Sequence, residues 1–194
     1  MKLNAKSMAQ IGMLSAIAGV LMLFEMPLWF APFFYQMDIS EVPVLIGGFA
    51  LGPIAAILIE LIKNLLKLVI SSTKTGGVGE ISNFIIGCSF VVPSAIYYHR
   101  NKTKKGAFVS LIIGTISLTV VGSILNAYIL LPVYSKAYGI SLENLILKGT
   151  EVNSGITDLK TFIMLAVAPF NLLKGLIASF ITFVLYKHIS TVLR

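Results

Sequence analysis

The stretch VPVLIGGFALGPIAAILIELIKNLLKLVI, residues 42–70, decides how this chain folds. It is apolar along most of its length and carries Gly52-Pro53 in its interior. A membrane-spanning helix needs about 20 apolar residues, so the stretch is either one long helix or two short ones. Proline removes a backbone donor, and the residue before it avoids helical geometry. These effects favour a break at Gly52-Pro53.

Charge decides between the two readings. Four further stretches are long and apolar enough to cross a membrane: Met8–Phe24, Ile81–Tyr98, Ala107–Leu131 and Thr161–Tyr186. The densest basic run is 99–105, and the positive-inside rule places it in the cytoplasm together with Lys2 and Lys6. An even number of crossings must separate these two regions, so residues 42–70 are predicted to form two helices. The chain then has six transmembrane helices, with both termini cytoplasmic.

The composition agrees with an all-α integral membrane protein in the cell membrane. The 194 residues are 57% hydrophobic and 12% charged, and the mean hydropathy is +0.92, whereas soluble domains carry about 25% charged residues. We expect a single transmembrane domain over residues 1–194, because no length remains for a nucleotide-binding domain. The net charge of +7 reflects basic residues at cytoplasmic helix ends, so no nucleic-acid partner is expected.

Ionisable groups within a membrane are costly and mark candidate functional sites. Glu60, Lys63, Asn64 and Lys67 share one face of the predicted third helix. They form either an internal polar cluster, with Lys67 reaching toward the outer surface, or a path for ions or protons. Internal pairing of Glu60 with Lys63 or Asn64 is the favoured interpretation for the first two residues.

A second polar group is predicted in the outer half of the membrane. Asn171 and Lys174 lie on one face of the sixth helix beside Pro169, whose missing N–H frees a backbone carbonyl, a feature of helices that line cavities. Asn83 and Asn126 lie at similar depth in the fourth and fifth helices. Amides offer both donors and acceptors, so these four residues either surround a polar ligand or make separate interhelical hydrogen bonds. Their convergence on one leaflet favours the pocket.

The two long loops are both predicted to be external. Residues 25–41 are rich in aromatic residues and proline, which is typical of a lid over a pocket or of an interfacial rim formed by Trp29 and Tyr35. Residues 136–160 contain a short helix around Leu142–Leu147. In the first helix, Gly12, Ala16 and Gly19 form a stripe of small residues. The stripe packs either against the protein's own helices or against a partner protein.

Signatures of enzymes are missing from the sequence. No phosphate-binding GxxxxGK[ST] loop occurs, no base lies near a candidate nucleophile, and no metal site is expected because His99 and His188 stand far apart. Neither an enzymatic activity nor a cofactor is therefore expected. A self-sufficient secondary transporter, with Glu60, Lys63 and Lys67 as an ion path, remains the alternative function, although the paired repeats of such proteins are not evident.

Several motifs resemble one known family. These are the segments 38–46 (DISEVPVLI), Gly52-Pro53, 63–66 (KNLL), Gly79-Glu80-x-x-Asn83 and Pro169-Phe170-Asn171-x-x-Lys174-Gly175. Their combination is similar to the riboflavin-specific substrate-binding (S) subunits of energy-coupling factor (ECF) vitamin transporters, which belong to the ABC transporters. The resemblance covers nearly the whole chain.

The resemblance implies a six-helix subunit that captures riboflavin from outside, with the first outer loop capping the pocket. It also implies assembly with a transmembrane coupling subunit and two cytoplasmic ATPases in the lipid bilayer. Related subunits dock through an Ala-xxx-Ala stripe in the first helix, which here reads Gly12-xxx-Ala16 followed by Val20. The expected ligand-binding residues are Met37, Asp38, Leu45, Lys67, Glu80, Asn83, Asn126, Asn171 and Lys174, and the expected docking residues are Gly12, Ala16 and Gly19.

Independently of the resemblance, apolar loop residues facing amides and a lysine suit a flat ligand with one apolar and one polar end. Riboflavin has this shape. Phosphorylated flavins fit less well, because the sequence shows no arginine or glycine cradle at this site for a phosphate.

Overall fold

The computed structural model describes residues 4–32, 34–71 and 76–193, without the side chains of residues 138 and 187–193. Predictions concerning Lys2, Phe33, Lys74, and the side chains of Lys187, His188 and Arg194 lie outside the described part. The helices are α1 (Ala5–Leu21), α2 (Glu41–Leu51), α3 (Pro53–Ser71), α4 (Val78–Arg100), α5 (Lys104–Leu125), α6 (Leu131–Tyr138), α7 (Leu142–Val152), α8 (Leu159–Phe162) and α9 (Ala168–Leu193). Two π-helical turns, η1 (Asn126–Leu130) and η2 (Ile163–Val167), join α5 to α6 and α8 to α9.

Residues 42–70 break at the predicted point. Helix α2 ends at Leu51 and α3 begins at Pro53, with Gly52 between them at a φ of 109°. That left-handed conformation suits glycine, and the ring of Pro53 fits the first position of a helix. The predicted division into two helices is therefore confirmed.

Within the described residues, three helical segments are long and apolar enough to cross a membrane, namely Val78–Arg100, Lys104–Ala137 and Leu159–Tyr186. Helices α1 and α2 are shorter and apolar, and α3 carries Glu60, Lys63 and Lys67. The helices pack on one another, with α2 held among α1, α3, α4 and α9, while large apolar side chains such as Ile81, Ile116 and Phe180 stay exposed on the outside of the bundle. The fold is that of an all-α membrane protein.

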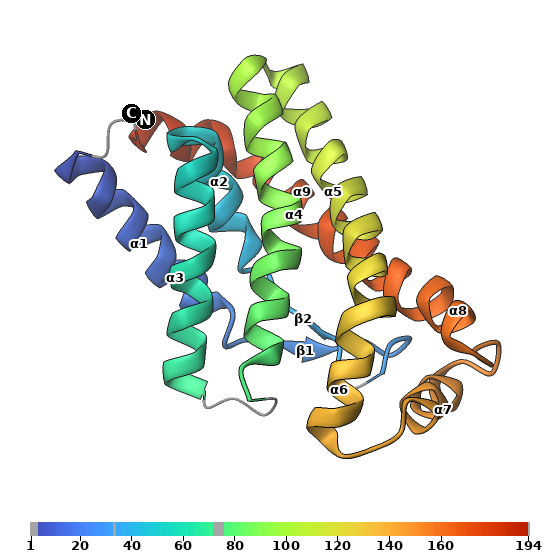
Figure 1. Cartoon of the computed structure of the whole chain (residues 1–194). Coiled ribbons are helices and arrows are strands. Elements are labelled where there is room, and N and C mark those ends of the chain that lie inside the picture. Colours follow the sequence, from blue (N-terminus) through green and yellow to red (C-terminus); the bar gives the residue numbers. More distant parts are fainter. Residues whose placement is uncertain (1–3, 33, 72–75, 194) are drawn as a thin grey trace.

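The two ends of the bundle differ (Figure 1). At one end lie the start of α1, the junction of α2 and α3, the turn between α4 and α5, and the end of α9. This is called the basic end, because the α4–α5 turn carries Arg100, Lys102, Lys104 and Lys105. The opposite end holds α6, α7 and the loop between α1 and α2, and is called the pocket end.

The loop between α1 and α2 contains structure that the sequence did not predict. Strands β1 (Met26–Pro27) and β2 (Gln36–Met37) pair in antiparallel fashion, with Met26 opposite Met37. In the second outer segment the predicted short helix is present as α7, but it extends to Val152.

The two π-helical turns have a common cause. Pro132 and Pro169 each follow a π-helical turn by two residues. Each lacks the N–H that would bond the carbonyl four residues earlier, at Tyr128 and Leu165, both within the turns. Such turns widen a helix locally and occur often at functional sites. They bring Asn126 and the segment before Asn171 to the same place in the bundle.

Candidate ligand-binding site

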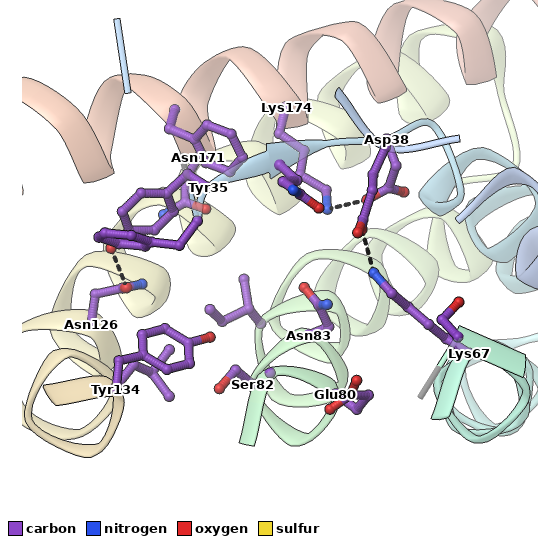
Figure 2. A pocket seen from close by; sticks show the side chains of 18 residues that line it. Tyr35, Asp38, Lys67, Glu80, Ser82, Asn83, Asn126, Tyr134, Asn171 and Lys174 are labelled. Carbon is purple, nitrogen blue, oxygen red and sulfur yellow. Dashed lines mark hydrogen bonds and ion pairs between the residues drawn. The ribbon is translucent and has the colours of Figure 1, made fainter. Parts of the chain in front are cut away.

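A cavity of about 450 Å³ opens at the pocket end, within the range of small-molecule sites. Its walls come from the α1–α2 loop, the end of α3, the start of α4, the η1–α6 segment and the start of α9. Figure 2 shows their polar side chains converging from these elements. The lining residues are Glu25, Phe34, Tyr35, Gln36, Asp38, Lys67, Ser71, Gly79, Glu80, Ser82, Asn83, Ile86, Asn126, Leu130, Tyr134, Phe170, Asn171 and Lys174.

The structure brings most of the predicted ligand-binding residues to this cavity. Those in its lining are Asp38, Lys67, Glu80, Asn83, Asn126, Asn171 and Lys174. The amides of α4, η1 and α9 therefore do converge, as the cavity interpretation requires. Their contact with a ligand stays a prediction.

Met37 and Leu45 lie elsewhere. Met37 packs in an apolar cluster with Leu131 and Phe162, whereas its neighbour Gln36 lines the cavity. Successive side chains of a strand point to opposite faces, so Met37 and Gln36 cannot both face the cavity. Leu45 is 1% exposed and lies in the main core of α2 and its neighbours.

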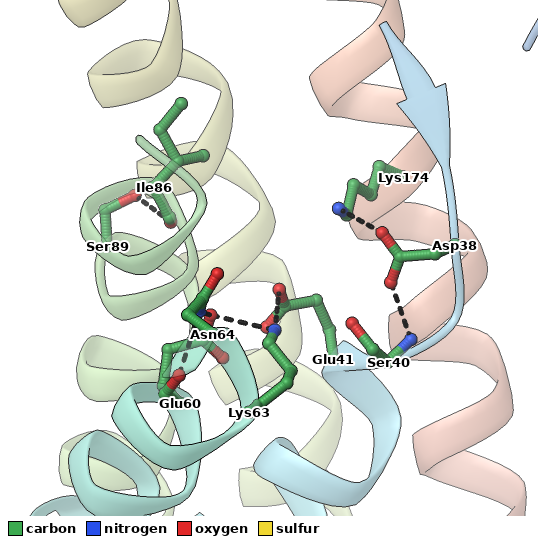
Figure 3. Close-up of polar contacts among 9 residues, drawn as sticks. All are labelled: Asp38, Ser40, Glu41, Glu60, Lys63, Asn64, Ile86, Ser89 and Lys174. Atoms are coloured by element: carbon green, nitrogen blue, oxygen red, sulfur yellow. Dashed lines mark hydrogen bonds and ion pairs between the residues drawn. The ribbon is translucent and has the colours of Figure 1, made fainter. Parts of the chain in front are cut away.

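An ion pair fastens the loop to α9. Lys174 Nζ lies 3.0 Å from Asp38 Oδ2, and the Ser40 backbone N–H donates to Asp38 Oδ1 at 2.8 Å. Both contacts appear in Figure 3. Burial alone would raise the pKa of the Asp38 carboxyl, but the ammonium groups of Lys174 and Lys63 outweigh it and hold that pKa well below its usual range. Asp38 is therefore a buried carboxylate that stays ionised.

A second contact fastens the loop to η1. The Tyr35 hydroxyl donates to Asn126 Oδ1 at 2.7 Å, and Asn126 Nδ2 donates to the Gly122 carbonyl at 2.7 Å. Burial raises the pKa of the Tyr35 phenol well above its usual value, with a smaller effect from Tyr134, so it remains a neutral donor. Tyr35 belongs to the cavity wall rather than to an interfacial rim. Trp29, in contrast, is 89% exposed.

The aromatic residues make one side of the cavity apolar. Phe34, Tyr35 and Phe170 all line it, and the rings of Tyr35 and Phe170 lie 5.3 Å apart. The amides and Lys174 supply the polar groups. The cavity thus combines an apolar aromatic wall with a polar amide cluster, which is what the sequence predicts for a flat ligand with two unlike ends.

Asn171 offers an unused donor. Among the described residues its Nδ2 atom is buried and has no hydrogen-bond partner. A Cβ added at Gly122 would lie only 2.7 Å from that atom, so the absence of a side chain at Gly122 makes room for the amide. Glycine at this position is required by the close approach of α9.

Lys67 connects α3 to the loop by an ion pair with Glu25. Both side chains are partly buried and both line the cavity. Glu25 was assigned only to the outer loop by the sequence, because nothing in the pattern indicates that it folds back over α3.

The sequence also failed to indicate Gln36, Tyr134 and Ser82 as lining residues. The direction of the Gln36 side chain depends on which face of β2 it occupies, and β2 is only two residues long. Tyr134 follows a π-helical turn, so its direction cannot be read from a regular helical period. Phe170 and Gly79 were missed although both stand in motifs that the sequence analysis singled out, Pro169-Phe170-Asn171 and Gly79-Glu80-x-x-Asn83.

A separate ionic cluster lies deeper in the bundle (Figure 3). Lys63 Nζ lies 2.8 Å from both Glu41 Oε1 and Glu60 Oε1, and Asn64 Nδ2 donates to Glu60 Oε1 at 2.9 Å. All four residues are at most 4% exposed, and none lines the cavity described above. The predicted internal pairing of Glu60 with Lys63 and Asn64 is confirmed. Glu41 was placed in the outer loop by the sequence, but it is buried as the first residue of α2.

The small-residue stripe of α1 divides between two surroundings. Gly12 and Ala16 are exposed, and a Cβ at Gly12 would meet nothing within 4 Å. Gly19 is buried, and a Cβ there would lie 3.1 Å from Leu66 Cδ1. Gly19 therefore serves the internal packing of α1 on α3, whereas Gly12 and Ala16 face away from the bundle.

The chain is similar in sequence to proteins named riboflavin transporters. The chain is 34% identical to the riboflavin transporter RibU of Staphylococcus aureus (strain TCH60) over 190 residues, covering 97% of this chain and 93% of that protein. It is also 34% identical to the riboflavin transporter FmnP of Bacillus subtilis (strain 168), covering 90% of this chain and 87% of that protein.

The fold has a close counterpart among solved structures. A structure described as the S component of a bacterial ECF transporter superposes with a TM-score of 0.75 and 34% identity, covering 97% of this chain and 98% of that chain. Residues 6–186 match the family described as "ECF transporter, substrate-specific component". These relatives are transporters by name and not enzymes, and the chain is a multi-pass protein of the cell membrane. It belongs to the family of substrate-specific (S) components of ECF transporters.

Proposed function

We propose that this chain is a riboflavin-binding S component, formed by one transmembrane domain of six spanning helices. The observation that carries the proposal is the cavity at the pocket end, where an aromatic wall faces Asn83, Asn126, Asn171 and Lys174. The isoalloxazine ring of riboflavin is flat, with an apolar benzenoid edge and a polar edge of carbonyl and N–H groups. The amides match the polar edge, and Tyr35 and Phe170 match the ring faces.

The unmodified vitamin fits better than its phosphorylated forms. The described lining contains the carboxylates of Glu25, Asp38 and Glu80 but no arginine. The two lysines of the lining, Lys67 and Lys174, are already paired with Glu25 and Asp38, so a phosphate would have to compete with these carboxylates for them. The neutral hydroxyls of a ribityl chain can instead donate to carboxylate oxygens.

The orientation follows from the two ends of the bundle. The positive-inside rule assigns the basic end, with Arg100, Lys102 and Lys104, to the cytoplasm. The termini are then cytoplasmic, the cavity opens to the outside, and the α1–α2 loop caps it. This arrangement suits a subunit that captures vitamin from outside.

Energy for uptake comes from partners in this proposal. The sequence contains no GxxxxGK[ST] motif for binding nucleotide phosphates. A transmembrane coupling subunit and two cytoplasmic ATPases therefore supply it, with Gly12 and Ala16 as the docking surface. The internal ion pairs of Lys63 with Glu41 and Glu60 argue against the alternative ion path of a secondary transporter.

Two measurements test the proposal. Protein purified without riboflavin is titrated with riboflavin while flavin fluorescence is followed, with flavin mononucleotide as the comparison ligand. Quenching at one site, with weaker binding of the mononucleotide, is expected. Unchanged fluorescence would exclude the assignment.

The second measurement is uptake into proteoliposomes with and without the coupling subunit and ATPases. Uptake only with the partners and ATP is expected. Uptake by the chain alone, driven by an ion gradient, would establish the secondary-transporter alternative instead.

A further inference from the structure

A second, apolar groove of about 420 Å³ runs along the outer surface between α5 and α9. It is lined by Phe108, Leu111, Ile112, Thr115, Ile116, Leu172, Leu176, Ser179, Phe180 and Phe183. The only two polar members, Thr115 and Ser179, hydrogen-bond to each other at 3.1 Å, so the groove presents a dry apolar surface. It is separate from the polar cavity, since none of its lining residues lines that cavity.

The dimensions of the groove favour a thin occupant. On α5 it extends from Phe108 to Ile116, which is about 12 Å at the helical rise of about 1.5 Å per residue. A helix is about 10 Å wide with its side chains, so it would contact such a groove through one face only. A single acyl chain is narrower and flexible, so it can fill the groove where a helix would only cover it.

The mouth of the groove is strongly basic. Lys104 and Lys105 open α5 one turn before Phe108, and Lys104 Nζ lies 5.9 Å above the centre of the Phe183 ring. Phe108 and Phe183 contact each other edge to face at the same end, with ring centres 5.9 Å apart. Lys104 therefore stands over the aromatic entrance, and Lys105, three residues before Phe108, shares that face of α5 by helical spacing.

No carboxylate of the surrounding helices balances these lysines. The sequence contains no Asp or Glu between Glu80 and Glu143, and none after Asp158. The basic turn and both helices of the groove thus lack acidic residues. An anion from outside the chain can therefore approach these exposed lysines without meeting a carboxylate of either helix, at the place where an acyl chain in the groove would begin.

We propose that the α5–α9 groove binds one anionic phospholipid. An acyl chain lies between Phe108 and Phe180, and the headgroup phosphate contacts Lys104 and Lys105. A zwitterionic lipid also has a phosphate, but its ammonium group is repelled by the same lysines, so anionic lipids are preferred. The bound lipid holds this face of the bundle in the leaflet at the basic end.

A tryptophan in the groove reports the occupant. The single native tryptophan, Trp29, is replaced by phenylalanine, and Phe180→Trp introduces a reporter in the groove. The protein is reconstituted in phosphatidylcholine vesicles containing rising fractions of brominated phosphatidylglycerol or brominated phosphatidylcholine. Ile124→Trp is the control, since Ile124 is exposed on α5, one wall of the groove, but lies at the end of that helix far from the basic turn.

Preferential quenching of the Phe180→Trp reporter by phosphatidylglycerol, about fivefold or more over phosphatidylcholine, is expected from the two lysines. The combined change Lys104→Ala and Lys105→Ala should bring the ratio close to one, with riboflavin titration as the check on folding. Ile112→Trp provides a second reporter in the groove.

Three results would overturn the proposal. Equal quenching by both lipids at both groove reporters would show that the lipid charge does not matter. The same preference at Ile124→Trp would show a general attraction to the whole surface. Groove reporters that neither brominated lipid quenches would show that protein, such as a second copy of this chain, covers the groove.

Discussion

At the scale of single residues, Asn171 and Gly122 depend on each other. Gly122→Ala would place a methyl group 2.7 Å from Asn171 Nδ2 and push that amide out of position. Asn171→Ala removes the amide itself. Because losing a partner for a buried polar group costs about 1–3 kcal/mol, both variants should bind riboflavin about tenfold or more weakly while remaining folded.

Fluorescence titration measures both affinities, and Gly12→Ala serves as the control because its new methyl group meets nothing within 4 Å. Wild-type affinity in Asn171→Ala would limit Asn171 to interhelical packing. Wild-type affinity in Gly122→Ala alone would show that the amide has another position from which it serves the ligand equally well.

Lys174 allows a prediction about pH. In the native protein the pKa of Asp38 is held well below its ordinary value of 3.8, mainly by Lys174 against the effect of burial. Because the pKa of Asp38 is lower in the folded protein than in the unfolded chain, ionised Asp38 stabilises the fold in full at any pH above its ordinary pKa of 3.8. Lowering the pH from 7 to 5 should therefore not release the loop.

In Lys174→Ala, burial acts on Asp38 with less opposition and raises its pKa. We expect burial, the largest single effect on the pKa of this carboxyl, to outweigh the remaining effects of Lys63 and Ser40. The folded variant then binds the proton more tightly than the unfolded chain, so lowering the pH from 7 to 5 should stabilise it relative to wild type. Thermal denaturation in detergent at both pH values tests this, and adding Asp38→Asn should abolish the pH effect. Riboflavin affinity should fall by about tenfold or more at pH 7. A variant that responds to pH as wild type does would contradict the ion pair.

Single residues also show what sequence reasoning can reach. Asn126, Asn171 and Lys174 were predictable because amides and charges are rare in apolar helices and must be directed inward. Gln36 and Met37 were not, since their directions depend on a two-residue strand pairing that no periodicity announces. Leu45 was attributed to the site only through the resemblance, and it lies in the core.

At the scale of elements, the cluster of Glu41, Glu60 and Lys63 ties α2 to α3. Lys63→Met would leave two buried carboxylates without their cation, and removing one partner of a buried pair costs about 3–5 kcal/mol. The melting temperature should fall by roughly 10 °C. Glu60→Gln keeps the contact of Lys63 with Glu41 and removes the repulsion between the carboxylates, so its loss should be much smaller.

Thermal denaturation of both variants in one detergent makes the comparison. Exposed Lys148, which pairs with Glu151 outside the core, offers a control in Lys148→Met with little expected effect. Equal losses in Lys63→Met and Glu60→Gln would mean that the two carboxylates do not share one cation.

The break between α2 and α3 shows how local sequence determines where a helix ends. The chemistry of Gly52-Pro53 favoured a break in the helix, and the positions of the basic residues then decided for two helices. The contact of His99 Nε2 with the Gly48 carbonyl at 3.0 Å, at the end of α2, was invisible in the sequence because it joins residues far apart along the chain. The π-helical turns were equally unpredictable in detail, although Pro169 indicated irregular backbone there.

At the scale of the whole molecule, α1 takes no part in the described cavity. None of the described residues that line the cavity comes from α1. The exposed face with Gly12 and Ala16 is accessible to a helix of another protein, because small side chains allow close approach. The α5–α9 groove, assigned above to lipid, lies on other helices. Because the cavity and the groove both lie on other elements, the exposed face of α1 is the candidate contact with a coupling subunit.

Bulk on α1 should act differently at its three small residues. Gly12→Leu and Ala16→Leu should leave riboflavin binding within about threefold, because both side chains point away from the bundle, but should reduce ATP-dependent uptake and co-purification of the coupling subunit. Gly19→Leu should instead lower the melting temperature of the isolated protein, since its Cβ lies 3.1 Å from Leu66 Cδ1. Normal uptake and co-purification in both outward-facing variants would assign docking to another helix, whereas uptake lost together with riboflavin binding would show that α1 supports the cavity rather than a partner.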